Sequence, residues 1–292
     1  MKTVSMGPFR TIILAILVVI LTINLVGIYL GFILNKTVLE PTFLIKILRE
    51  LEAYGQVRQL MFRMVNRSLP NGQDSLPYLE KAISEDWLEV EINLLLEGFY
   101  SFAKGKRSDT PTISFQKLKK EVVNALEDNR TYQERTRLVQ FWFDPMPDEV
   151  NMEDFMSVDF LWGIRNVAIM ITWLPWVICV ISLFILLSMY LAILDWKQLV
   201  LWISVGLITA GALLILLGIS VEWVSGRMSI VMNTIDRFAS YEIPVSTMNN
   251  FVDTLIDGLV RPINIIGIIS IIVGGIALYM VPVKERNLII VK

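Results

Sequence analysis

The sequence predicts an all-α integral membrane protein, with four transmembrane helices and an α-helical extracytoplasmic domain built from the 1–2 and 3–4 loops. Two observations predict this fold. Of the 292 residues, 54% are hydrophobic and only 18% are charged, whereas charged residues make up about a quarter of soluble domains. The apolar residues are also concentrated in four uncharged runs, each as long as the ~20 residues that a helix needs to cross a bilayer.

These runs are the four predicted spans, and they cover residues 11–34, 167–194, 199–221 and 263–283. The first is longer than the ~7 to 15 apolar residues of a signal peptide and lacks a small-residue cleavage pattern, so we expect a retained anchor. Only residues 195–198 join spans two and three. These two helices must therefore form an antiparallel hairpin.

The distribution of basic residues predicts the orientation. The tails 1–10 and 284–292 and the turn 195–198 together hold six basic and two acidic residues, while the rest of the chain holds 20 basic and 26 acidic ones. Short cytoplasmic segments carry an excess of Lys and Arg. We therefore expect a multi-pass protein of the cell (plasma) membrane, with both termini cytoplasmic and the large domain outside.

Residues 35–166 are predicted to form the main part of this domain. Apolar residues at helical spacing predict one long amphipathic helix over residues 41–68. Ser84 is a good N-cap, and the acidic residues after it favour a second helix that begins there. The rest is predicted as a break at 105–111, an extended segment at 112–115, a helix at 116–127 and a loop at 141–150.

The loop between spans three and four, residues 222–262, has the same amphipathic character. Its first part is predicted to continue the third span as a helix, and its last part leads back to the fourth. The apolar faces of these segments need a partner. We expect that partner to be residues 35–166, so that the two loops form one domain.

The protein contains no histidine and a single cysteine, Cys179, within the second span. Histidine-dependent nucleophiles, His-rich zinc sites and His-ligated haem are therefore excluded. The outer domain cannot form a disulfide, which favours a bacterial or archaeal source. No phosphate-binding loop, metal-binding or nucleic-acid motif is present. We expect no enzyme activity, no cofactor and no nucleic-acid partner.

Polar and small residues within the spans are candidates for helix packing. The spans contain no charged residue, unlike those of most transporters. Asn24 is expected to form a hydrogen bond with a neighbouring helix rather than to line a polar pathway. Small residues at helical spacing let helices approach closely, here within the four-helix unit or, as the alternative, between subunits. These candidates are Gly27, Gly31, Gly206, Ala210, Ser270 and Gly274.

Charged residues flank the predicted outer ends of the spans. They are interpreted as a solvated, salt-bridged rim, with a cation or lipid-headgroup site as the alternative. This set consists of Glu153, Asp154, Asp159, Glu222 and Asp257 with Arg165, Arg227 and Arg261. Three sequons, at Asn35, Asn66 and Asn129, are candidate glycosylation sites.

The segment DWLEVEINLLLEG at residues 86–98, followed by ISFQKL at 113–118, resembles uncharacterised four-span membrane proteins of bacteria and archaea. The resemblance covers most of the chain, because the order of basic tail, anchor, helical domain and three further spans is similar. It implies a helical extracytoplasmic domain but no activity and no site residues.

Three functions are compatible with these features. The first is a non-enzymatic interaction or assembly component, anchored in the lipid bilayer, whose outer domain binds a protein partner or further copies of the chain. The second is an oligomeric channel or pore-forming subunit. The third is lipid or small-molecule binding at the outer membrane surface. The missing catalytic chemistry and the small-residue helix faces favour the first.

Overall fold

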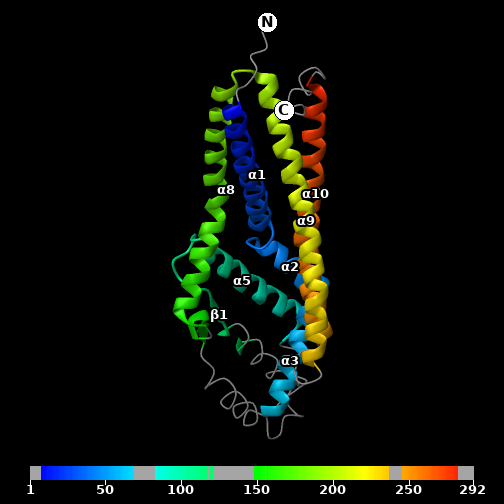
Figure 1. Cartoon of the computed structure of the whole chain (residues 1–292). Coiled ribbons are helices and arrows are strands. Elements are labelled where there is room, and N and C mark those ends of the chain that lie inside the picture. Colours follow the sequence, from blue (N-terminus) through cyan, green and yellow to red (C-terminus); the bar gives the residue numbers. More distant parts are fainter. Residues whose placement is uncertain are drawn as a thin grey trace, which may run out of the picture. The chain divides into compact units, whose positions relative to one another are not determined.

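The computed structural model describes residues 8–68, 83–116, 119–120, 148–154, 156–236 and 245–281 (Figure 1). This part of the chain is mostly helical. Its helices are α1 (Pro8–Lys36), α2 (Pro41–Glu50), α3 (Ala53–Ser68), α5 (Glu85–Ala103), α8 (Val158–Ile193), α9 (Trp196–Asp236) and α10 (Val245–Met280), with a 3-10 turn at Met152–Asp154. Two short strands, β1 (Thr112–Ser114) and β2 (Glu149–Asn151), complete it.

Four of these helices, α1, α8, α9 and α10, are long and apolar enough to cross a membrane. The prediction of four apolar helices is therefore confirmed. The helices do not stop where the uncharged runs stop, because α8 begins at Val158 and α9 continues to Asp236. The fourth ends at Met280, slightly before the predicted boundary at 283, and carries Pro262 inside it.

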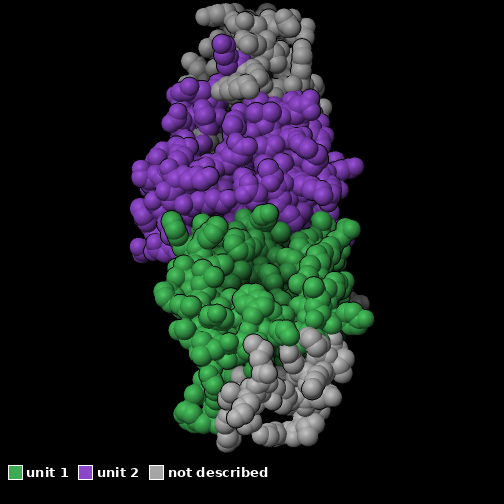
Figure 2. All heavy atoms as spheres, turned by 90° about the horizontal axis from the view of Figure 1, so that it is seen from above, with its two compact units in different colours: residues 1–37, 170–234, 252–292 green, residues 38–169, 235–251 purple. Residues whose placement is uncertain are grey.

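The chain divides into two compact units, which Figure 2 distinguishes by colour. Unit 1 comprises Met1–Thr37, Met170–Thr234 and Val252–Lys292. Unit 2 comprises Val38–Ile169 and Ile235–Phe251. Parts of both predicted exterior loops thus belong to unit 2, whereas residues 222–234 and 252–262 of the second loop belong to unit 1. That the two loops form one domain stays a prediction. That this unit is extracytoplasmic stays a prediction.

Unit 1 is held together by apolar contacts among the four long helices. One cluster joins α1, α8 and α9 and consists of Leu14, Val18, Leu21, Met189, Ile193 and Leu199. A second joins α1, α9 and α10 through Ile33, Leu214 and Ile263. Lipid tails are as apolar as these side chains, so close van der Waals packing rather than the hydrophobic effect stabilises such contacts in a membrane.

Unit 2 is built around α2, α3 and α5. The sequence predicted one helix over 41–68, and this prediction is wrong at Leu51 and Glu52, where the chain turns between α2 and α3. Glu52 adopts a φ of 50°, in the left-handed region that ends a helix. The break allows α3 to turn away from α2, and both helices contact α5.

The predicted start of α5 is confirmed. The Ser84 hydroxyl accepts a hydrogen bond from the Trp87 backbone N–H at 3.1 Å, which satisfies one of the free donors of the first turn. Trp87 and Leu88 are then buried in the unit, as are Ile47 of α2 and Tyr54 of α3.

The two strands pair antiparallel, with Thr112 opposite Asn151 and Ser114 opposite Glu149. The extended segment predicted at 112–115 is confirmed over Thr112–Ser114. The loop predicted at 141–150 is wrong at its last two residues, because their backbone groups form the ladder that β1 requires. Gln116, Lys119 and Lys120 are helical, and the rest of the helix predicted at 116–127 lies outside the described residues.

Candidate functional site

Among the described side chains of unit 2, Arg165, near the beginning of α8, has an unusual environment for a cation. Its guanidinium carbon lies 4.7 Å from the centre of the Trp162 ring and 5.2 Å from that of Phe102. Trp162 precedes Arg165 by three residues and therefore shares its face of the helix. The two rings also contact each other edge to face at 5.9 Å. Phe102 comes from the end of α5 and is fully buried, whereas Trp162 is 44% exposed.

A glycine turn brings the end of α5 next to this arginine. Gly105 has a φ of 73°, a conformation that glycine adopts without the strain of a side chain. A Cβ at this position would lie 3.1 Å from Cδ1 of Ile169 and 3.9 Å from Nη2 of Arg165. The guanidinium is therefore bounded by two aromatic rings and by backbone.

Arg165 forms no ion pair or hydrogen bond with another described residue, and its Nη1 is buried without an acceptor. Two neighbouring cations of this unit, by contrast, are paired with carboxylates. Nζ of Lys104 lies 2.9 Å from Oε2 of Glu40, and Nη2 of Arg107 lies 2.5 Å from Oδ2 of Asp109. A buried donor without a partner costs about 1 to 3 kcal/mol, and more when it is charged. The contacts with the two rings offset part of this cost.

The salt bridges expected for the outer rim are not found among the described residues. Glu153 instead accepts a hydrogen bond from the Thr110 hydroxyl at 3.0 Å, and Asp154 accepts one from the Asn151 backbone N–H at 2.9 Å. In α9, the guanidinium of Arg227 lies 3.8 Å from the centre of the Trp223 ring. Two of the three rim arginines thus stack on tryptophan, whose π face competes with carboxylates for a guanidinium.

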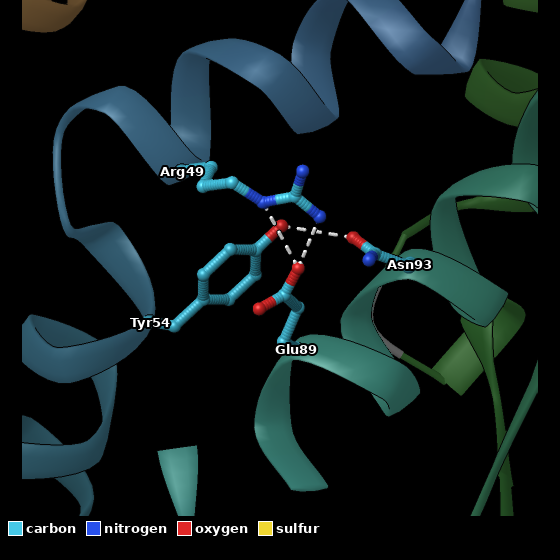
Figure 3. A network of polar contacts seen from close by, with 4 residues as sticks. All are labelled: Arg49, Tyr54, Glu89 and Asn93. Atoms are coloured by element: carbon cyan, nitrogen blue, oxygen red, sulfur yellow. Dashed lines mark hydrogen bonds and ion pairs between the residues drawn. The ribbon is translucent and has the colours of Figure 1, made fainter. Parts of the chain in front are cut away.

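A second polar network of unit 2 connects α2 and α3 to α5 (Figure 3). Arg49 of α2 donates to Glu89 of α5, its Nε lying 3.1 Å from the carboxylate. The Tyr54 hydroxyl of α3 donates to Oδ1 of Asn93 at 2.8 Å. Burial raises the pKa of Tyr54, and the charge of Glu89 adds to that shift. The hydrogen bond with Glu89 raises the pKa of Arg49. At neutral pH both groups are protonated, so they act as structural donors rather than as proton carriers.

The two small residues predicted in span one contact a neighbouring helix of the same chain. A Cβ on Gly31 would lie 2.4 Å from Cγ of Pro175, and one on Gly27 would lie 3.2 Å from Cδ1 of Ile178. Both contacts join α1 to α8. The proline ring thus occupies the space that the missing Gly31 side chain leaves.

The small residues predicted in α9 and α10 take part in two helix contacts, one between α9 and α1 and one between α9 and α10. Gly206 faces α1, where a Cβ would lie 3.6 Å from the Thr22 hydroxyl, and Ala210 is fully buried. Ser270 of α10 donates a hydrogen bond to the backbone oxygen of Leu207 at 3.0 Å. A Cβ on Gly274 would lie 2.9 Å from the backbone oxygen of Ser204, so α9 and α10 approach closely there.

A close contact between α9 and α10 was not predicted from the sequence. A Cβ on Gly211 would lie 2.5 Å from the backbone oxygen of Gly267, and one on Gly218 would lie 2.2 Å from Oδ1 of Asn264. Gly211 and Gly218 are seven residues apart, as are Gly267 and Gly274. A search for this heptad spacing, which is typical of left-handed helix pairs, would have found them.

The predicted polar and glycosylation sites have different surroundings. Nδ2 of Asn24 is buried without a hydrogen-bond partner among the described residues, so the expected interhelical bond is not found for this donor. Asn35 forms such a bond instead, because its Nδ2 donates to the backbone oxygens of Gly31 and Ile171, both at 3.0 Å. A glycan would have to attach to this same nitrogen. The side chain of Asn66 and all of Asn129 lie outside the described residues.

Within the described residues, no group of three or more His, Cys, Asp or Glu side chains could hold a metal ion. Cys179 is a partly buried free thiol in α8. No family model, curated protein or solved structure matches the chain. The resemblance to four-span bacterial and archaeal proteins therefore stays a prediction, and the arrangement of this chain's own residues carries the functional argument.

Proposed function

We propose that the protein is a non-enzymatic, membrane-anchored interaction or assembly component that acts through unit 2 as its extracytoplasmic helical domain. The observation that carries this proposal is that the small-residue faces of the helices already pack against other helices of the same chain. Pro175 fills the space beside Gly31, and the backbone of Gly267 fills the space beside Gly211. A second copy of the protein could not use the same positions without separating these helices.

In this proposal a partner therefore binds to unit 2. Two polar contacts, Arg49 with Glu89 and Tyr54 with Asn93, connect α2 and α3 to α5. These contacts hold α2, α3 and α5 in one arrangement, which lowers the conformational entropy lost when a partner binds. In this proposal the four apolar helices act as a packed anchor in the cell membrane, with both termini in the cytoplasm.

Crosslinking in native membranes, followed by native mass spectrometry in mild detergent, tests this function. We expect an oligomer or a co-purifying protein, with crosslinked lysines in unit 2, such as Lys46 or Lys106, which are exposed. A monomer without a co-purifying protein would contradict the proposal. Conductance of the reconstituted protein in a planar bilayer would instead support the channel alternative.

A further inference from the structure

We propose that Arg165 and Trp162 form a binding site for a phosphate group, and that the phosphate belongs to an anionic membrane lipid. This inference goes beyond the proposed function and does not depend on it. It rests on the environment of the guanidinium, on the position of Arg165 along α8 and on the recurrence of the same pair in α9.

The environment of Arg165 leaves a positive charge available. Lys104 and Arg107 of the same unit are paired with carboxylates, whereas the described residues around the Arg165 guanidinium offer its charge π faces and no carboxylate. A guanidinium presents several N–H donors in one plane, an arrangement that matches two oxygens of a phosphate group. A bound phosphate would supply the acceptor that Nη1 lacks.

The position of Arg165 favours lipid as the source of this phosphate. It is the last charged residue of α8 before an uncharged run that continues to the end of the helix at Ile193. Three exposed tryptophans occur along this part of the sequence of α8: Trp162 just before the run, and Trp173 and Trp176 in its first part. Tryptophan and arginine at the end of a membrane span lie at the level of the lipid headgroups, where phosphate is the abundant anion.

The same combination recurs independently in α9. Arg227 follows Trp223 by four residues, stacks on its ring and forms no ion pair with a described residue. Both pairs flank an uncharged helical run. Arg227 is exposed, however, whereas Arg165 also contacts Phe102 and the Gly105 turn, so the built site is the one at Arg165.

Access to Nη1 requires a movement of one side chain. Phe102 is fully buried, whereas Trp162 is 44% exposed, so Trp162 is the ring that can move toward solvent without disturbing the core. We infer that the phosphate displaces the edge of the Trp162 ring and then contacts Nη1. The emission of Trp162 should therefore change when the lipid binds.

The test uses the full-length chain in neutral detergent, with phosphatidylglycerol, phosphatidylcholine, glycerol 3-phosphate or inorganic phosphate added. Bound lipid is counted by native mass spectrometry, and affinity is taken from the rise in the thermal unfolding midpoint. We expect phosphatidylglycerol to bind the unchanged protein and Arg165→Gln to weaken that binding roughly tenfold. The matched control is Arg107→Gln, which removes one positive charge from the same unit but leaves the site intact.

Two further variants keep the test decisive if Arg165→Gln does not fold. Arg165→Lys keeps the charge but loses the planar donors, so binding should be weakened to an intermediate degree. Trp162→Phe keeps an aromatic face and should retain binding without the change in emission. Equal affinity for glycerol 3-phosphate would assign the site to a soluble phosphate ester. Equal losses in Arg165→Gln and Arg107→Gln, or no loss in either Arg165 variant, would overturn the proposal.

Discussion

At the scale of single residues, Tyr54 links the stability of unit 2 to pH. Its side chain is 3% exposed and its hydroxyl donates to Asn93. Burial raises the pKa of Tyr54 above the ordinary value of 10.0, so the folded state holds this proton more tightly than the unfolded state does. The contribution to stability is thus complete below pH ~10 and is lost as the pH rises through the folded pKa.

We therefore expect the thermal unfolding midpoint of the protein in detergent to fall at alkaline pH. Burial also raises the pKa of Tyr100, so the two tyrosines act in the same direction. Tyr54→Phe should lower stability by about 1 kcal/mol at neutral pH, because a buried hydrogen bond is lost. It should also reduce the alkaline decrease. A decrease of unchanged size in this variant would show that Tyr54 is not coupled to folding.

At the scale of elements, the turn between α2 and α3 stores backbone strain at Glu52. The left-handed conformation destabilises a residue that has a side chain by about 1 to 2 kcal/mol, and glycine avoids this cost. Glu52→Gly should therefore slow hydrogen exchange in α2 and α3 and stabilise the unit by up to about 1 kcal/mol. The control Glu50→Gly, at the last position of α2, also removes the exposed ion pair with Lys46 and should destabilise the unit rather than stabilise it. If both variants behave alike, the left-handed turn does not limit stability.

The contact between α9 and α10 offers a matched pair of adjacent glycines. A Cβ on Gly274 would lie 2.8 Å from Cγ1 of Ile208, whereas a Cβ on Gly275 would meet nothing within 4 Å. Gly274→Ala should separate the helices and lower the unfolding midpoint. Gly275→Ala should be neutral or should stabilise the protein by roughly 0.5 to 1 kcal/mol through helix propensity. Denaturation with a charged detergent measures both, and equal effects would contradict this packing.

At the scale of the whole molecule, the predicted orientation is open to direct measurement. Cys179 is the only cysteine, so Cys179→Ala provides a background for single new cysteines. We expect Lys106→Cys to react with a membrane-impermeant maleimide in intact cells, and Thr3→Cys and Asn287→Cys to react only after permeabilisation. The opposite pattern would invert the orientation. Different accessibility of the two termini would contradict four spans.

Features that depend on local composition could be predicted from the sequence. The four apolar helices follow from uncharged runs longer than a bilayer is thick. The start of α5 follows from Ser84 and the acidic residues after it. Both features depend on neighbouring residues alone, so no knowledge of distant contacts was needed.

The tertiary structure decided what depends on residues far apart in the chain. The pairing of β1 with β2, the approach of Gly211 to Gly267 and the stacking of Arg165 on Phe102 all join segments separated by tens of residues. The sequence identified Arg165 as part of a charged rim, but it could not show that aromatic rings rather than carboxylates surround it. Local periodicity determines which face of a helix is apolar, whereas the partner of that face is chosen by the packing of the whole chain.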